Sequence, residues 1–319
     1  MNIGSLITST NAYKIFSGDK RCKTLSHATL IVCDDKDMLE AYINYFAKSY
    51  MCESEYPCDY CRTCRLIESK NYEDVIFYPK DKRINVEDID DLVEKSYVKP
   101  LENDKKLFVL LNAQDMNDKA QNKLLKTLEE PPKNTYILLG ATSTFSLLPT
   151  VLSRVKRLDI LPFLDDDIYN LLKNNYDSND LKSAIKLSDG RLGEVLKRLK
   201  GGSSFEFENL VLDIYKNLKS SKEIIYYANK INKDNIKDFI AISSKIFLDV
   251  IRLKCGKEPI SFNKSDVMEI SSEYTIGAAI SAEDVLRNSE KSLFYNANVQ
   301  ATVDGILFGV LEGRNKWSK

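Results

Sequence analysis

The sequence predicts an α/β domain, a parallel sheet with helices on both faces, followed by a small helical domain and an all-α C-terminal domain. Three observations predict this order. Short apolar runs alternate with amphipathic stretches in the first half, helical periodicity takes over from Pro162, and a Gly-Gly-Ser-Ser run at 201–204 reads as a flexible connector. We therefore expect domains at 1–162, 163–204 and 205–319.

The predicted sheet rests on short apolar runs in the first half of the chain. Runs of this kind are typical of strands that are covered on both faces. The candidates are Ala28–Cys33, Val75–Tyr78, Leu107–Leu111, Tyr136–Leu139 and Leu158–Ile160. Between them, residues 38–49, 86–98 and 120–130 have helical spacing. This alternation predicts a parallel sheet between two layers of helices.

The stretch from Asn122 to Arg154 predicts three elements in succession. Leucines at helical spacing form a helix that Pro131 and Pro132 stop, because proline has no N–H to donate and disfavours a helical residue before it. A strand follows, and residues 146–152 then predict a short helix with a proline tolerated near its start. That helix ends at Ser153 and Arg154.

The C-terminal half predicts helices only. Residues 165–174, 179–188 and 192–199 are expected to be short helices, and residues 236–253 a long one with a wide apolar stripe. A stripe of this kind marks either an interior face or a surface for a partner helix, and both readings stay open.

The composition is that of a globular protein: 319 residues, 43% hydrophobic and 29% charged. A formal net charge of −1 gives no general attraction to DNA or RNA. No apolar run approaches the roughly 20 residues needed to cross a bilayer. The first residues lack the features of a signal peptide, so we expect a cytoplasmic protein.

The string LLKTLEEPP, followed by a strand and LLPTVLSR, resembles the central signature of the clamp-loader subunits of bacterial DNA polymerase III, in the AAA+ superfamily. The resemblance extends from about Tyr13 to about Leu311 and is strongest from Lys105 to Leu158. It implies an AAA+ α/β domain, a small helical lid domain and a helical collar domain that joins subunits into a ring.

The nucleotide site of an active AAA+ subunit is not evident in this sequence. A phosphate-binding loop needs glycine and Gly-Lys-Ser/Thr after the first strand, whereas this chain has Asp34-Asp35-Lys36-Asp37. We expect Asp37 to cap the next helix and fill the anion site. Asn112-Ala113-Gln114 replaces the acidic pair that would bind Mg²⁺. The resemblance puts the sensor arginine at Gly193, with Arg191 nearby, so we expect this chain to bind no ATP.

Ser153 and Arg154 match the family's Ser-Arg-Cys motif, with Val155 in the third position. The resemblance implies that Arg154 acts as an arginine finger, reaching the γ-phosphate bound by a neighbouring subunit, and that Ser153 supports it. A guanidinium suits this role because it is permanently charged, planar and multiply donating. The alternative is that Arg154 only interacts with the carbonyl end of its own short helix.

Four cysteines fall within residues 52–64. Cys52, Cys58, Cys61 and Cys64 can converge on one tetrahedral ion, and four thiolates complete a structural zinc site. Disulfides and a thioredoxin-like redox pair are the alternatives, disfavoured by the expected cytosolic location and by the number of cysteines. A zinc loop after the first helix also resembles the family. Outside the loop, Cys22, Cys33 and Cys255 are expected to be buried thiols and His27, the only histidine, to be structural.

The combination of a zinc loop, a lost phosphate site and a retained Ser-Arg resembles a clamp-loader subunit that does not hydrolyse ATP. It implies gamma/tau and delta subunits as partners, with the sliding clamp and primer-template DNA met through the assembled complex. The expected cofactor is structural Zn²⁺, with no small-molecule substrate and no membrane.

Two other functions remain open from the sequence. One is a divergent, gamma/tau-like AAA+ ATPase, which ATP binding by the isolated chain would favour. The other is a zinc-dependent nucleic-acid adaptor, for which Lys48, Arg62 and Arg65 are available near the cysteines. Acidic residues around the loop argue against the adaptor: Glu53, Glu55, Asp59 and Glu68.

Overall fold

Five parallel strands form the centre of the N-terminal part of the chain, in the order β2-β3-β4-β1-β5. They are β1 (Ala28–Val32), β2 (Val75–Tyr78), β3 (Lys106–Leu110), β4 (Thr135–Ala141) and β5 (Lys156–Asp159). A computed structural model describes residues 3–80, 83–201, 203–294 and 297–317. The predicted parallel sheet is confirmed, and β1 lies between β4 and β5.

The chain divides into two compact units, each described here by itself. The first comprises Met1–Asn175 and Ser188–Glu194, and the second Tyr176–Leu187 and Val195–Lys319. The predicted division at residues 162 and 204 into three domains stays a prediction.

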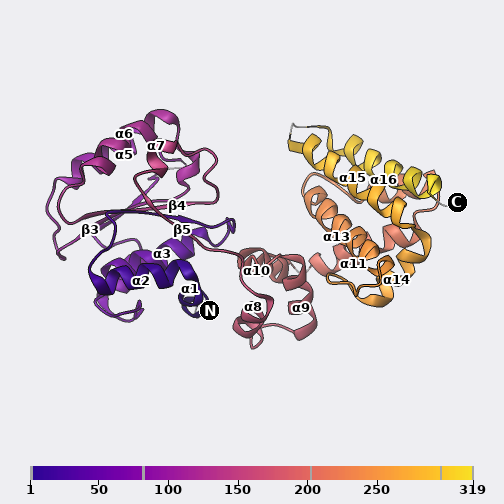
Figure 1. Cartoon of the computed structure of the whole chain (residues 1–319), viewed down its shortest axis with the longest axis horizontal. Helices are drawn as coiled ribbons and strands as arrows, with labels where there is room; N and C mark the ends of the chain where they lie inside the picture. The colour runs from indigo at the N-terminus through magenta and orange to yellow at the C-terminus, as the bar shows by residue number, and fades with distance from the viewer. Residues whose placement is uncertain (1–2, 81–82, 202, 295–296, 318–319) are drawn as a thin grey trace. The chain divides into compact units, whose positions relative to one another are not determined.

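Helices cover both faces of the sheet in the first unit (Figure 1). One layer contains α1 (Gly4–Ser9), α2 (Asn11–Cys22) and α3 (Leu39–Met51), with α4 (Arg62–Glu68) packed on α3. The other contains α5 (Val86–Ser96), α6 (Asp118–Glu129) and the single-turn α7 (Pro149–Leu152). Aromatic rings of α2 and α3 pack against each other in the first layer. The ring centroid of Phe16 lies 4.8 Å from that of Tyr50 and 5.2 Å from that of Phe46.

Side chains at the starts of the helices explain where several of them begin. Asn85 and Asp88 form a reciprocal capping box on α5. The side chain of Asn117 accepts a hydrogen bond from the N–H of Ala120 and caps α6, which ends just before Pro131. Apolar residues of α6 then pack against the sheet, in one core with Phe108 and Leu110 of β3.

The remaining helices follow β5. Helix α8 (Asp165–Leu172) belongs to the first unit, and α10 (Leu192–Gly201) contains residues of both units. The second unit contains α9 (Ser178–Leu187), α11 (Ser203–Asn217), α12 (Ser221–Ala228), α13 (Ile236–Lys254), α14 (Lys264–Glu273), α15 (Ile276–Phe294) and α16 (Val299–Lys316). The predicted connector at 201–204 is wrong where the structure describes it, because Gly201 ends α10 and Ser203 begins α11. Gly202 lies outside the described residues.

The second unit has a helical core in which α13 is central. The apolar stripe of α13 is an interior face here, since Phe239, Ile246, Phe247 and Val250 are all fully buried. This decides between the two readings of that stripe. Across the described part of the chain, no helix is both long enough and apolar enough to span a bilayer.

Candidate functional site

The turn that joins β1 to α3 contains a buried carboxylate. Asp35 is 5% exposed, and its Oδ2 accepts a 2.8 Å hydrogen bond from the backbone N–H of Gly193. Its backbone oxygen accepts from the N–H groups of Met38 and Leu39, where α3 begins. Burial raises the pKa of Asp35, because desolvation disfavours the charged form. Asp35 therefore lies where a phosphate group would approach the start of a helix.

The expectation that Asp37 caps α3 is wrong. Asp37 is exposed, and α3 begins without a side-chain cap among the residues that the structure describes. The physical reason is that the buried Asp35 already supplies a backbone acceptor to the first amides of the helix. The sequence pattern did not distinguish between neighbouring aspartates.

Residues 189–194 lie beside this turn. A Cβ atom at Gly193 would lie 2.4 Å from Asp35 Oδ1, so only glycine permits this approach. Arg191 lies among carboxylates: its Nη1 is 3.6 Å from Asp34 and its Nη2 is 3.6 Å from Asp189. Its Nε donates to Glu194 at 3.1 Å. The guanidinium thus contacts acidic side chains of the protein at this position.

The end of β3 carries neutral side chains. Asn112 adopts a left-handed conformation, with φ of 55°, and Ala113–Asp115 form one turn of 3-10 helix. The amide oxygen of Gln114 accepts a 3.2 Å hydrogen bond from the N–H of Thr142, and its backbone oxygen accepts from the Ser146 hydroxyl at 2.5 Å. Gln114 therefore connects the end of β3 to the loop after β4.

Gln121 is a site residue that sequence reasoning missed. Its side chain is fully buried, and Nε2 donates to the carbonyl oxygens of Met116 and Ser146 at 3.1 and 2.9 Å. Its Oε1 accepts from the N–H of Leu148 at 2.8 Å. The available signal was a glutamine on the same helix face as Leu124 and Leu128. Gln121 fixes the loop that leads into α7.

Arg154 follows α7 and is 35% exposed. Its Nη1 donates to the carbonyl oxygen of Thr150 at 2.9 Å and to the hydroxyl of Ser153 at 3.2 Å. Its Nη2 lies 2.6 Å from Oε1 of Glu129, the last residue of α6. Ser153 is exposed, and its hydroxyl donates to Thr150. The structure therefore brings the predicted Ser153 and Arg154 together with a carboxylate that the sequence pattern did not identify.

The predicted cysteine cluster converges in the structure. The Sγ atoms of Cys52, Cys58, Cys61 and Cys64 all lie within 4.8 Å of one another. The separations are 3.8 Å between Cys52 and Cys58 and 4.0 Å between Cys58 and Cys64. Four thiolates at ~2.3 Å from a tetrahedral zinc ion would be about 3.8 Å apart, so the donor set fits Zn²⁺.

Backbone amides orient two of the four sulfurs. The Sγ of Cys58 accepts from the N–H of Cys61 at 3.4 Å, and the Sγ of Cys61 accepts from the N–H of Cys64 at 3.3 Å. Cys61 is also the N-cap of α4, so the helix and the cluster begin at the same residue. Hydrogen bonds of this kind stabilise the thiolate form that a metal requires.

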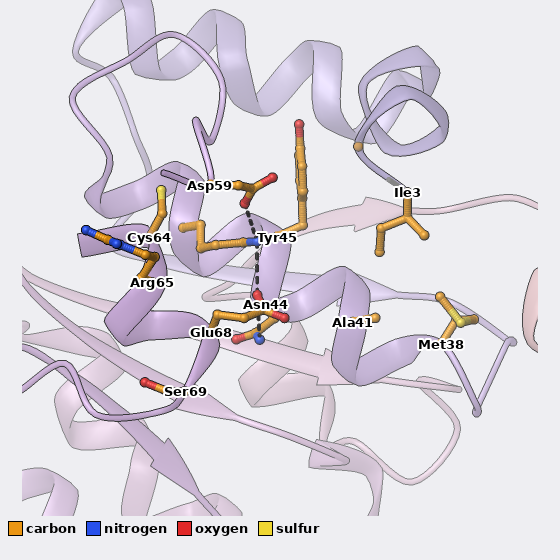
Figure 2. Close-up of a pocket in the computed structure, with 12 residues that line it drawn as sticks. Ile3, Met38, Ala41, Asn44, Tyr45, Asp59, Cys64, Arg65, Glu68 and Ser69 are labelled. Atoms are coloured by element: carbon orange, nitrogen blue, oxygen red, sulfur yellow. Dashed lines mark hydrogen bonds and ion pairs between the residues drawn. The ribbon is translucent and has the colours of Figure 1, made fainter. Parts of the chain in front are cut away.

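A buried lysine connects the cysteine loop to α3. The amine of Lys48 lies 2.6 Å from Asp59, inside the loop, and 3.0 Å from Glu68 of α4, and the lysine side chain is only 11% exposed. A cavity of about 750 Å³ opens beside it, lined also by Met38, Ala41 and Tyr45 (Figure 2). Lys48 is therefore a structural cation here, and its charge is balanced by two carboxylates.

The other cysteines and the histidine have simple surroundings. Cys33 is buried as expected, but Cys22 and Cys255 are exposed, so the expectation is wrong for these two. Both lie at helix C-termini, where the chain turns at the surface. His27 Nε2 donates to the carbonyl oxygen of Leu128 at 2.9 Å, a structural contact.

Comparison with known proteins shows what this chain is similar to. The family described as "DNA polymerase III, delta subunit" matches residues 8–163. The chain is 30% identical over 182 residues to the delta' subunit of Haemophilus influenzae, covering 55% of this chain and 56% of that one. It is 28% identical over 194 residues to a gamma subunit of Buchnera aphidicola, covering 58% of this chain and 52% of the relative. The match thus spans about half the length of these two relatives.

Other comparisons cover most of the chain. The delta' subunit of Bacillus subtilis is 27% identical over 301 residues, which is 84% of this chain and 85% of that one. A solved structure of a DNA polymerase III gamma-subunit-related protein from Thermotoga maritima shares the fold, with a TM-score of 0.50, 18% identity, and coverage of 94% of this chain and 99% of that one. By these matches the chain is similar to delta' and gamma subunits of bacterial DNA polymerase III, over most of its length in the case of the Bacillus subtilis delta' subunit.

Proposed function

We propose that this chain is a delta'-type clamp-loader subunit that does not hydrolyse ATP and instead supplies Arg154 to an ATP site on a neighbouring subunit. The observation that carries the first half of the proposal is the buried Asp35 carboxylate at the start of α3, hydrogen-bonded to Gly193. The partly exposed position of Arg154 supports the second half.

Asp35 opposes phosphate binding in two ways. The backbone oxygen of Asp35 already accepts from the first amides of α3, and the negative charge of its carboxylate would repel a triphosphate at short range. Asp34 and Asp37 add further negative charge to the same turn, with Lys36 as the single cation in its sequence. No glycine is available there to let the backbone wrap a phosphate.

The region that would bind Mg²⁺ and activate water is also unsuited to that chemistry. Asn112 and Gln114 are neutral, and the Gln114 amide oxygen accepts a backbone hydrogen bond. Neutral amides cannot supply the charge that holds the metal, nor a general base for water. The nearest carboxylate, Asp115, is exposed.

Arg154 is suited to act on a phosphate outside its own subunit. When water attacks the γ-phosphorus of ATP, the bond to the bridging oxygen breaks and negative charge develops on the phosphoryl oxygens and the ADP leaving group. A guanidinium directed at these oxygens stabilises that charge, and such arginines accelerate hydrolysis by about 10³–10⁵-fold in other nucleotide hydrolases. Because the guanidinium of Arg154 is partly exposed, it can meet such a ligand without unfolding α7.

We propose that Cys52, Cys58, Cys61 and Cys64 bind one structural Zn²⁺. Four thiolates leave no open coordination position, so the ion would stabilise the loop without taking part in a reaction. Residues 53–60 of this loop, between α3 and α4, form no strand or helix, so regular secondary structure does not stabilise it. The metal would therefore fix the start of α4 relative to the end of α3.

The partners in this proposal are gamma/tau and delta subunits, and the sliding clamp and primer-template DNA are met through the assembled complex. The gamma and delta' relatives support this assembly role. The same relatives keep a gamma/tau-like ATPase as the alternative function. ATP binding by this chain separates the two.

The experiment has two arms. The isolated chain is titrated with a fluorescent ATP analogue and Mg²⁺, and no saturable binding is expected. The chain is then assembled with gamma/tau and delta subunits, and ATP turnover is measured with clamp and primed DNA. Arg154→Ala should reduce turnover while leaving the complex intact. Tight ATP binding by the isolated chain, or unchanged turnover with Arg154→Ala, would contradict the proposal.

A further inference from the structure

Two adjacent carboxylates end α6, and within the described residues one of them has a cationic partner. Glu129 is the last residue of the helix and Glu130 is its C-cap. The carbonyl end of a helix carries partial negative charge, so acidic side chains are unfavourable there without compensation. Glu129 meets the guanidinium of Arg154, whereas the side chain of Glu130 has no ion-pair partner in the described parts of the chain. The two glutamates thus differ in their contacts at the same helix end.

The contacts of Arg154 leave one edge of the guanidinium available. Nη1 donates hydrogen bonds to Thr150 and Ser153 of its own segment, and Nη2 forms an ion pair with Glu129. Among residues 3–80, 83–201, 203–294 and 297–317, Nε has no partner. A guanidinium has five N–H donors in a fixed plane, so three contacts through the two Nη atoms determine the orientation of the plane.

We infer that Glu129 is a positioning residue for Arg154: it holds the guanidinium with its Nε edge free to donate to the phosphate of a neighbouring subunit. This inference rests on the proposed function. The contacts come from two segments, α6 and the end of α7, which the buried Gln121 fixes relative to each other through Ser146 and Leu148. A guanidinium that is already held in one orientation loses less conformational freedom when it binds its ligand.

Glu129 is expected to orient the guanidinium of Arg154 and to contribute little to the stability of the fold. The pair is partly exposed, with Glu129 at 49% and Arg154 at 35%, and exposed ion pairs contribute little to stability. Loss of Glu129 lets Arg154 sample other rotamers, and misplacement of a group that acts in the transition state lowers the rate of the chemical step. The change should therefore appear in kcat more than in KM for ATP.

The experiment uses the complete assembly of this chain with gamma/tau and delta subunits. Glu129→Ala and Glu130→Ala each remove one carboxylate from the same helix end, so Glu130→Ala is a matched control for helix propensity and charge. We expect Glu129→Ala to lower the clamp- and DNA-stimulated kcat about threefold to tenfold, with Glu130→Ala within about twofold of the unmodified chain. The Tm of each isolated variant should stay within about 2 °C of the unmodified chain.

The double variant Glu129→Ala/Arg154→Ala decides whether the two residues act together. If Glu129 works through Arg154, the double variant is no slower than Arg154→Ala alone. Additive losses would overturn the inference, as would an unchanged kcat for Glu129→Ala beside a slow Arg154→Ala, and in both cases the proposed function would stand. An Arg154→Ala variant with normal turnover would instead overturn the proposed function, and this inference with it.

Discussion

The backbone N–H of Gly193 donates a 2.8 Å hydrogen bond to the buried carboxylate of Asp35, from 158 positions further along the chain. This single bond joins the turn after β1 to the start of α10. It also explains why residue 193 is glycine, because a Cβ there would lie 2.4 Å from Asp35 Oδ1 and 2.8 Å from Asp37 Cβ. A buried carboxylate and a glycine thus form a contact beside the start of α3.

Gly193→Ala should destabilise the first unit. The added methyl group would push against Asp35 and break or lengthen a hydrogen bond to a buried carboxylate, at a cost of about 1–3 kcal/mol in the free energy of unfolding. Gly18→Ala is the control, because a Cβ at Gly18 in α2 would have no atom within 4 Å. That substitution should raise stability by up to about 1 kcal/mol through helix propensity. Urea unfolding of both variants measures the difference, and equal effects would contradict this account of the Asp35 contact.

The sheet could be predicted from sequence because its strands are contiguous apolar runs. The exception is β5, expected at 158–160 and found at Lys156–Asp159. Its pattern has an exposed Arg157 and Asp159 around the buried Leu158, since an edge strand needs apolar side chains only where it is covered. The prediction from the Gly-Ser run at 201–204 failed in the opposite direction, because Gly201 and Ser203 are helical despite the low helix propensity of glycine.

Site residues were predictable where the sequence spacing itself determines the site. The cysteine spacing sufficed to predict that the four sulfurs converge, because the cysteines lie within 13 residues of one another, at 52–64. The partners of Arg154 and Asp35 were not predicted, because Glu129 and Gly193 reach them only through the fold. Ion pairs between segments depend on rotamers and tertiary packing, neither of which leaves a periodic pattern in sequence.

Asp91 should make the stability of the first unit depend on acid pH. Its carboxylate contacts the amines of Lys80 and Lys95 at 2.7 and 3.0 Å and the hydroxyl of Tyr78 at 2.5 Å. Burial alone would raise the pKa of Asp91, but these donors outweigh it and lower the pKa to about 2 from 3.8. A lowered carboxyl pKa gives stability that is present above about pH 4 and is lost as pH falls toward 2.

Asp91→Asn should therefore cost about 1–2 kcal/mol at pH 7 and less at pH 3. The measurement is the free energy of unfolding in urea at both pH values. Asp104→Asn provides an exposed control, expected to follow the pH dependence of the unmodified chain. A cost for Asp91→Asn that is the same at pH 3 and pH 7 would show that its charge is not what stabilises the fold.

Lys48 should influence how tightly the cysteine loop binds zinc. Its amine joins Asp59 in the loop to Glu68 in α4 at 2.6 and 3.0 Å. Lys48→Met keeps most of the buried side chain but leaves two carboxylates without their cation, so the loop becomes free to move away from α4. We expect zinc affinity to fall about tenfold, as for loss of other residues that support metal ligands.

The measurement is the release of zinc to a competing chromogenic chelator, with one ion per chain expected in the unmodified protein. Lys70→Met is the control, because Lys70 pairs with Glu40 on the surface away from the cysteines. Cys61→Ser should lower affinity further than Lys48→Met, since it removes a ligand. Equal release from Lys48→Met and Lys70→Met would mean that the lysine only supports the fold.

Each unit contains a buried aspartate that accepts hydrogen bonds from three successive backbone amides. In the first unit, Asp74 is fully buried and accepts from the N–H groups of Leu101, Glu102 and Asn103 at 2.7–2.8 Å. In the second, Asp249 of α13 is 1% exposed and accepts from residues 260, 261 and 262 at 2.8, 2.8 and 3.0 Å. Both carboxylates fix a loop by accepting hydrogen bonds from three of its backbone amides.

Asp249→Asn should loosen the loop at residues 260–262, because an amide has one acceptor oxygen for three donors and its NH₂ group would face the N–H groups. The expected cost is about 2–3 kcal/mol. Hydrogen–deuterium exchange at peptide resolution tests this with a crossed control. Asp249→Asn should speed exchange at 260–262 and leave 101–103 unchanged, and Asp74→Asn should do the reverse. If either variant sped exchange equally in both loops, the aspartates would be acting on global stability and not through their own three amides.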